Sequence, residues 1–274
     1  MTPRLNLFLL VVLLLVGVPL YWFQFDASAP GAKPLPLTIG KLRQLADEIP
    51  GDSPTHLHEE LIGYRSVLHN QIAAGGGLRP IRLSVRAFEL TVPDAGPIMI
   101  DAGTTPAGAE ERHLQDYDTA AQARIDRHVE AAGLRLVLLD HLLHRGNRAL
   151  VSPGARPLPD FSDGEPHAVA HGVVAIPLKG LPNRAMMVYA RLENGREYLF
   201  TGDVATINEN WVDARPPART FSTVGDVDER VRIVSWLKTI NALKHAAPAM
   251  FIVPGHDPGP VPGALRGFTK DRSR

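Results

Sequence analysis

Two segments far apart in the chain each end a hydrophobic strand with a side chain that can bind a metal ion. Residues 198–203 read Tyr-Leu-Phe-Thr-Gly-Asp and present the carboxylate of Asp203. Residues 251–257 read Phe-Ile-Val-Pro-Gly-His-Asp and present the imidazole of His256. Carboxylate oxygens and imidazole nitrogens are common ligands of divalent cations. Two such groups at distant strand ends predict a site that the fold assembles.

A third segment adds two more imidazoles. The apolar run 134–139 leads directly into Asp140-His141-Leu142-Leu143-His144. Two imidazoles and one carboxylate are enough for a single open site of the facial-triad type. If a metal binds, its candidate ligands are His141, Asp203 and His256, with His144 as a further candidate through a shifted loop. The favoured interpretation is that the same residues form a hydrogen-bonded polar cluster without metal.

The elements that must position these groups follow from hydrophobic periodicity and turn residues. A helix capped by Thr38 is expected to run through Glu48, and 152–171 is expected to be loop. Strands are predicted at 81–92, 97–103, 134–139, 173–176, 185–192, 197–200 and 251–253, and longer helices at 119–132 and 226–246. Two runs of strands, each followed by a helix, predict two sheets inside and helices outside.

The order of four of these segments resembles that of the metallo-β-lactamase-fold hydrolases. The similar segments, within residues 80–260, are Ile100-Asp101-Ala102-Gly103, Leu136-Val137-Leu138-Leu139-Asp140-His141, Leu199-Phe200-Thr201-Gly202-Asp203 and Val253-Pro254-Gly255-His256-Asp257. The resemblance implies an α/β fold, the four-layer αβ/βα sandwich of this family. It also implies a metal-dependent hydrolase of an ester, lactone or amide. Asp101 is expected to support a ligand or cap a turn.

The main ligand motif of that family, His-X-His-X-Asp-His, is incomplete in this chain. An ungapped alignment keeps only His141 and places Leu143, Arg145 and Gly146 on the other three ligand positions. A further histidine position falls on Leu181. A guanidinium stays charged and would repel a dication. If the cluster holds no metal, Arg145 is therefore expected to take the place of a cation and pair with Asp203.

The resemblance therefore implies an incomplete dinuclear site with no cofactor or a single zinc ion. Two functions follow from it. The chain is either a catalytically silent homologue that binds a small molecule or a protein, or a mononuclear hydrolase. The other histidines are predicted to lie outside the site, with the segment 55–59 (Thr-His-Leu-His-Glu), His113, His128 and His245 at the surface. His167 and His171 flank the predicted loop and are weaker candidates.

The N-terminus is too apolar to belong to a globular domain. Residues 7–23 carry no charge, Arg4 precedes them and Asp26 follows. An apolar run of about 17 residues is near the minimum for a membrane-spanning helix. We predict a membrane anchor at 1–25, a Pro/Ala-rich tether at 26–37 and the sandwich domain at 38–274. The alternative is a signal peptide cleaved near Ala27-Ser28-Ala29.

This topology predicts a single-pass protein of the inner (cytoplasmic) membrane with its domain on the periplasmic, or more generally extracytoplasmic, side. Among the 274 residues, Lys+Arg and Asp+Glu are balanced at 29 each, so nucleic acid is not an expected partner. The chain has no cysteine, which excludes disulfides, thiolate metal sites and cysteine nucleophiles.

Overall fold

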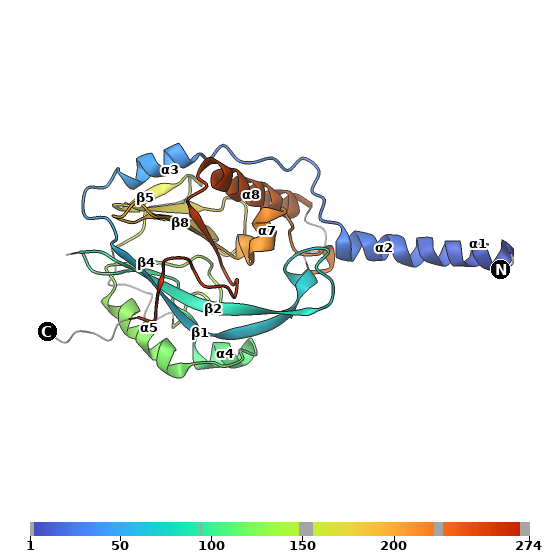
Figure 1. The fold of residues 1–274 in the computed structure, drawn as a ribbon, viewed down its shortest axis with the longest axis horizontal. Helices are drawn as coiled ribbons and strands as arrows, with labels where there is room; N and C mark the ends of the chain where they lie inside the picture. Colours follow the sequence, from blue (N-terminus) through green and yellow to red (C-terminus); the bar gives the residue numbers. More distant parts are fainter. Residues whose placement is uncertain (1–2, 94, 148–155, 222–226, 269–274) are drawn as a thin grey trace.

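Two five-stranded sheets face each other in the computed structural model, which describes residues 3–93, 95–147, 156–221 and 227–268 (Figure 1). In the first sheet the strand order is β10 (Leu265–Arg266), β1 (His56–Leu68), β2 (Pro80–Thr91), β3 (Ile98–Ile100) and β4 (Leu134–Leu136). In the second it is β5 (His167–Ala170), β6 (Val173–Pro177), β7 (Met186–Arg191), β8 (Glu197–Gly202) and β9 (Phe251–Pro254). The pairs β1–β10, β3–β4 and β8–β9 are parallel, and the others are antiparallel.

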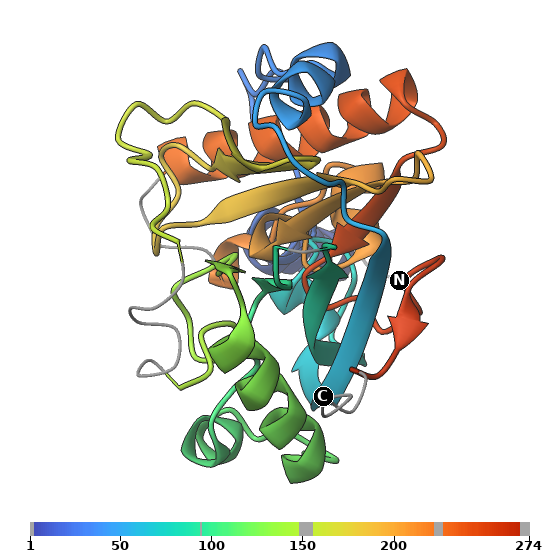
Figure 2. The same ribbon diagram turned by 90° about the vertical axis from the view of Figure 1, so that its left-hand side faces the viewer.

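Helices cover the outer face of each sheet (Figures 1 and 2). Helices α3 (Ile39–Ala46) and α8 (Val227–Ala246) cover the second sheet, and α4 (Pro106–Glu111) and α5 (Thr119–Ala131) lie below the first. The short helices η3 (His69–Gln71), η4 (Asp203–Ala205), α7 (Asn208–Val212) and η5 (Arg219–Phe221) lie in the connections. The predicted four-layer αβ/βα sandwich is confirmed.

Strand periodicity explains why the second sheet reads as unbroken apolar sequence. In β6, Val173 and Ala175 face the core between the sheets, whereas Val174 and Ile176 pack against the helices. Successive side chains of a strand point to opposite faces, so a sheet covered on both sides needs apolar residues at every position. The two sheets meet at Phe88 and Phe200, whose ring centroids are 5.0 Å apart.

Two of the predicted helices, α3 and α5, open on a capping residue and begin where the sequence places them. Thr38 accepts a hydrogen bond from the Lys41 amide at the start of α3, as predicted. Asp118 accepts from the amides of Ala120 and Ala121 at the start of α5. Such caps satisfy amides that have no partner within the helix.

Strand β1 was not predicted, because its charged residues disguise it. The expectation that 55–59 is solvated surface is wrong for His58 and Glu59, which are 8% exposed each. Glu59 pairs with Arg86 of β2, and Glu60 pairs with Arg124 of α5 at 2.7 Å. Buried carboxylates are tolerated when a guanidinium satisfies them, and no local pattern reveals such a partner.

Two smaller expectations also fail. His128 is not a surface residue, because its ring is 12% exposed and is hydrogen-bonded to Glu89. The predicted loop 152–171 contains strand β5, while its first residues, 152–155, lie outside the described ranges.

The N-terminal helix projects away from the sandwich (Figure 1). It comprises α1 (Pro3–Val12), η1 (Leu13–Gly17), α2 (Val18–Leu20) and η2 (Tyr21–Phe25). By length and composition it could cross a membrane, and a signal sequence near the N-terminus has the same properties. The predicted tether at 26–37 is not a free linker, because the Leu35 amide donates to Thr239 and Lys238 donates to the Ala32 carbonyl, each over 2.8 Å.

Candidate metal centre

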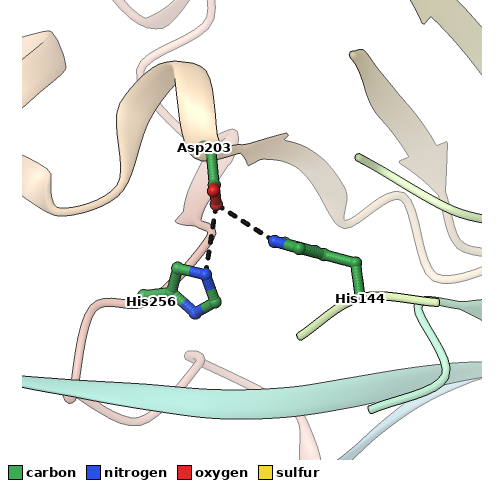
Figure 3. A group of neighbouring side chains, drawn as sticks. All are labelled: His144, Asp203 and His256. Carbon is green, nitrogen blue, oxygen red and sulfur yellow. Dashed lines mark hydrogen bonds and ion pairs between the residues drawn. The ribbon is translucent and has the colours of Figure 1, made fainter. Parts of the chain in front are cut away.

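Three polar side chains converge from loops that follow strands of both sheets (Figure 3). Asp203 opens η4 directly after β8, and His256 comes two residues after β9. His144 lies in the turn that follows β4. A Cβ atom added at Gly255 would lie 2.8 Å from the backbone of Gly202, so the absence of a side chain allows the β8 and β9 ends to approach.

A single carboxylate oxygen lies between the two imidazoles. The Nε2 atoms of His144 and His256 are each 3.1 Å from Oδ1 of Asp203. The three potential ligand atoms lie within 4.8 Å of one another. The imidazoles are buried, with side-chain exposures of 1% and 8%, whereas the Asp203 side chain is 34% exposed. The cluster is therefore enclosed by protein on the histidine side and open to solvent beside the carboxylate.

The far nitrogen of each imidazole is held by an acceptor. Nδ1 of His144 is 2.7 Å from Oδ2 of Asp101, and Nδ1 of His256 is 2.8 Å from the Ser84 carbonyl oxygen. The second oxygen of Asp101 accepts from the Leu138 amide at 2.8 Å. Since a carbonyl oxygen can only accept, Nδ1 of His256 carries a proton. Asp101 thus supports a histidine, as its position predicted.

This arrangement fits a small divalent cation. With the proton on Nδ1, a neutral imidazole presents a lone pair at Nε2. Two such lone pairs facing a carboxylate oxygen repel it unless both rings gain a second proton or a cation lies among the three atoms. Histidine ligands of metals usually donate their other N–H to a carboxylate or carbonyl, as both do here.

Without a metal, the charges within the cluster compensate one another. Burial raises the pKa of Asp203, but the charges of His144 and His256 outweigh this effect and hold it well below the usual range. Burial likewise lowers the pKa of His144, but the charges of Asp101 and Asp203 raise it well above its ordinary value. A cation is therefore required beside Asp203, whether it is a proton on a ring or a metal ion.

His141 lies beside this cluster rather than in it. Its ring centroid is 6.3 Å from that of His144, and it is not among the three converging groups. Burial, assisted by the positive charge of Arg112 and opposed by Asp203, lowers the pKa of His141 to about 4. The ring is therefore neutral at pH 7. The structure thus brings together Asp203 and His256 with His144, and places His141 at the edge.

The position of His144 changes the alignment with the family motif. If His144 occupies the last histidine of His-X-His-X-Asp-His, His141 falls on the second. The first histidine then falls on Leu139 and the aspartate on Leu143, which is 4% exposed in the core against α5. Under that alignment the motif is shifted by two residues from the ungapped alignment that starts at His141.

Arg145 consequently lies one residue beyond the motif. Its guanidinium donates to Asp140 over 2.9 Å, so within the described residues its ion pair is with Asp140 and not with Asp203. The prediction that Arg145 replaces the cation beside Asp203 is wrong. Residues 142–144 form a turn, and the side chains of His144 and Arg145 have different partners although the two residues are adjacent.

Sequence reasoning missed two arginines near the site. Arg65 lies on β1, and burial together with the charge of Arg112 lowers its pKa, while the charge of Asp203 raises it. Arg112 follows α4 and also acts on His141. Both guanidiniums therefore contribute positive potential near the cluster. No pattern in the sequence identified Arg65, because β1 itself was not recognised.

A pocket of about 1040 Å³ adjoins this region on the side of Asp140 and Arg145. It reaches Leu181, the position at which the resemblance implied a further histidine, and is also lined by Phe161 and Lys179. None of the three converging residues lines the pocket. The pocket and the cluster are thus neighbours that share the loop after β4.

The two histidines that flank the predicted loop have other partners. His167 pairs with Asp163 at 2.9 Å, and Nδ1 of His171 donates to the Ile49 carbonyl at 2.8 Å. His167 begins β5, the edge strand of the second sheet, and His171 follows its last residue. Neither is among the residues that converge on Asp203.

No family model matches this sequence, and no curated protein matches it. Solved structures do match the fold. A quorum-quenching N-acyl homoserine lactone lactonase is similar with a TM-score of 0.59 and 16% identity, over 76% of this chain and 95% of that one. An N-acyl homoserine lactone hydrolase with N-hexanoyl-L-homoserine bound at its catalytic metal centre has a TM-score of 0.58 and 15% identity, over 75% and 94%.

A probable metal-dependent hydrolase from Staphylococcus aureus is similar with a TM-score of 0.51 and 9% identity, over 75% of this chain and 91% of that chain. At these identities the likeness concerns the fold. The chain has the metallo-β-lactamase fold that its ordered strand-end motifs predicted.

Proposed function

We propose that this protein is a mononuclear metal-dependent hydrolase acting on an ester, lactone or amide. A single divalent cation would be held by Nε2 of His144, Oδ1 of Asp203 and Nε2 of His256. One observation carries the proposal: both imidazoles direct Nε2 at one carboxylate oxygen over 3.1 Å while their Nδ1 atoms are held by acceptors. Three protein ligands and an open position are typical of catalytic metal sites.

The chemistry divides between the cation and the chain's own residues. When bound, a divalent cation supplies Lewis acidity and acidifies a coordinated water molecule. Asp101 and the Ser84 carbonyl hold the two imidazoles in the orientation that presents Nε2. Neutral His141, at the edge, can accept a proton. The guanidiniums of Arg65 and Arg112 favour negative charge developing on a carbonyl oxygen.

A lactone is the first substrate class to test. Two of the similar structures are N-acyl homoserine lactone hydrolases, and hydrolysis of a lactone needs a polarised carbonyl and a proton acceptor. The adjoining pocket combines the apolar side chains of Phe161 and Leu181 with the charged groups of Lys179 and Arg145. Such a lining suits an apolar chain joined to a polar head.

A second candidate function is a catalytically silent protein that binds a small molecule or a protein partner. Leu139, Leu143 and Leu181 stand at three ligand positions of the family motif and offer no lone pair to a metal. A complete dinuclear site is therefore not expected. The fold itself depends on its sheets and core, so loss of metal chemistry need not unfold it.

Metal titration of the full chain in detergent separates the two candidates. After chelation, the protein is titrated with Zn²⁺, Mn²⁺ or Fe²⁺ by calorimetry. The hydrolase proposal expects one ion per chain and its loss in His144→Ala and His256→Ala. The matched control His245→Ala changes an exposed histidine in the last turn of α8 and should bind as the parent does.

Hydrolysis of lactones and aryl esters is then measured on the same preparations. Turnover that requires the added ion and disappears in His256→Ala supports the hydrolase. His141→Ala should keep the metal and lose rate, because it lies outside the three ligands. Failure of every variant and of the parent to bind an ion would refute the hydrolase and leave the silent protein.

A further inference from the structure

The end of the N-terminal helix is bound to two connecting segments of the domain. The Gln24 carbonyl accepts from the Gly75 amide at 3.0 Å. Its side chain accepts from Asn70 at 2.9 Å and donates to Thr220 at 2.8 Å. Residues at the end of the helix thus contact both the turn between β1 and β2 and the helix η5, which are more than a hundred residues apart.

A second set of contacts follows immediately. Arg219 donates to the Asp26 carboxylate at 2.6 Å and lies over the Trp22 ring at 4.0 Å. Arg230, which is 4% exposed, donates to the carbonyls of Asp26, Ser28 and Pro217 over 2.6–3.1 Å. Two of these three acceptors belong to the segment after the helix.

These contacts fix the direction of the helix relative to the domain. A buried guanidinium is stable only while its donors are satisfied, so the domain retains this segment as part of its own structure. Cleavage after Ala29 would remove Asp26 and two of the three acceptors of Arg230. The helix therefore leaves the domain at a set place, beside the turn between β1 and β2 and beside η5 (Figure 1).

The surface around that place carries exposed apolar side chains. Leu78, in the turn between β1 and β2, is 67% exposed, and Phe221, at the end of η5, is 41% exposed. Arg79 follows Leu78 and is exposed as well. Apolar and aromatic side chains beside a cation suit the interface of a bilayer, where rings and aliphatic groups enter the headgroup region and cations meet lipid phosphates.

We propose that Leu78 and Phe221 rest in the headgroup region of the bilayer that the helix 3–25 crosses, with Arg79 facing lipid phosphates. The partner is the lipid surface itself, because the helix that must enter the lipid emerges between these two segments. The sandwich would then be held in one orientation on the membrane. This inference is independent of the proposed metal chemistry and depends on the helix being retained and inserted.

The chain contains no cysteine, so single cysteines can be introduced without background. The full chain is prepared as Leu78→Cys, Phe221→Cys and the control Leu265→Cys, each labelled with an environment-sensitive fluorophore. Leu265 is 47% exposed and pairs with His58 on β1. His58 lies ten residues before Leu68, and a strand rises about 3.3 Å per residue, so the control lies roughly 30 Å from the turn.

The labelled proteins are reconstituted in vesicles with and without spin-labelled lipids that quench fluorescence at headgroup depth. We expect at least about twofold stronger quenching at positions 78 and 221 than at 265, with blue-shifted emission. Equal quenching at all three positions, or none at position 78, would overturn the proposal. So would an intact mass showing that the mature protein lacks residues 1–29.

A second variant tests the rigid connection separately. Arg219→Ala removes the ion pair with Asp26 and the contact with Trp22 while leaving the helix in place. Quenching at position 78 should fall toward that of the control if the connection holds the domain down. Unchanged quenching would show that the connection does not orient the domain and would contradict that step.

Discussion

The candidate metal centre and the junction after the N-terminal helix each hold a carboxylate beside cationic side chains, which are imidazoles at the centre and guanidiniums at the junction. We call the contacts of Asp26 with Arg219 and Arg230 the junction. At the junction, Asp26 is paired with the guanidinium of Arg219, and Arg230 donates to carbonyls around it. At the candidate centre, Asp203 faces two imidazoles. The Asp26 side chain is 11% exposed, whereas that of Asp203 is 34% exposed.

The difference separates a structural site from a site that can exchange its cation. Arginine keeps its charge at any relevant pH, so the junction is complete without added ions. An imidazole can lose its second proton and present a lone pair instead, so a metal ion can replace the protons beside Asp203. An aspartate paired with arginine is therefore suited to a structural role, whereas an aspartate paired with histidines can exchange protons for a metal ion.

The largest effect is expected at the junction. Arg230→Leu removes a buried guanidinium that donates to three carbonyl groups, of which that of Ser28 also accepts from Arg219, and we expect a loss of about 3–5 kcal/mol in the free energy of unfolding. For a domain of this size that corresponds to a fall in Tm of roughly 6–20 °C. Thermal unfolding of the full chain in detergent, followed by circular dichroism, measures it.

Arg230→Lys is the matched control and should lose less, because an ammonium can still donate to some of these carbonyls. A loss below about 1 kcal/mol in Arg230→Leu would contradict the structural role that distinguishes the junction from the metal centre.

Asp101→Asn should weaken metal binding without unfolding the protein. Asp101 accepts from both His144 and the Leu138 amide, and an asparagine has only one acceptor oxygen for these two donors. Its backbone φ is 61°, a left-handed conformation that asparagine tolerates. We expect an affinity about 10–100-fold lower. Competition with a chromophoric chelator measures it, with Asp160→Asn as an exposed control; equal affinities would refute the supporting role of Asp101.

The junction should also show a defined dependence on pH. Burial raises the pKa of Asp26, but hydrogen bonds from Arg219 and Ser28 outweigh it and lower the pKa below its ordinary value of 3.8. A depressed folded pKa gives stability that is present above 3.8 and is lost as the pH falls through the folded value. Asp26→Asn should therefore be less stable than the parent at pH 7, by about 1.5 kcal/mol.

That difference in stability should shrink below pH 4, because the parent carboxylate then becomes protonated and is neutral, as the asparagine is. Denaturant unfolding of both proteins between pH 3 and 7 tests this. A difference that stays constant with pH would show that the charge of Asp26 is not what the junction uses.

The smallest effect is expected at Arg145. Its guanidinium pairs with the 42%-exposed Asp140, and such pairs contribute about 0–1 kcal/mol. Arg145→Ala should leave metal affinity unchanged in the same chelator competition. An increase of tenfold or more would mean that Arg145 occupies the place of a cation beside Asp203 after all, and would make the centre resemble the junction.

Much of the fold could be predicted because its signals are local. Strands β6 to β9 are apolar runs that end at turns, and α3 begins at a threonine cap. Strand β1 could not be predicted, because Glu59 and Glu60 break its apolar pattern and their partners Arg86 and Arg124 lie far along the chain.

The site divides in the same way. Asp203 and His256 were predicted because each follows a buried strand and a glycine. The choice between His141 and His144 depends on how the turn after β4 directs two rings that are three residues apart. That turn is held by the hydrogen bond to Asp101, a contact across 43 residues.

The sequence by itself determined the layered fold, the apolar N-terminal helix and the two strand-end ligands, because period, turn chemistry and hydropathy act over a few residues. Only the tertiary structure decided which histidine meets Asp203, where Arg145 points and how the helix is bound to the domain. Those outcomes depend on hydrogen bonds and ion pairs between residues that are distant in the sequence. The strength of these contacts depends on burial and distance in the folded protein, so no periodic pattern in the sequence reveals them.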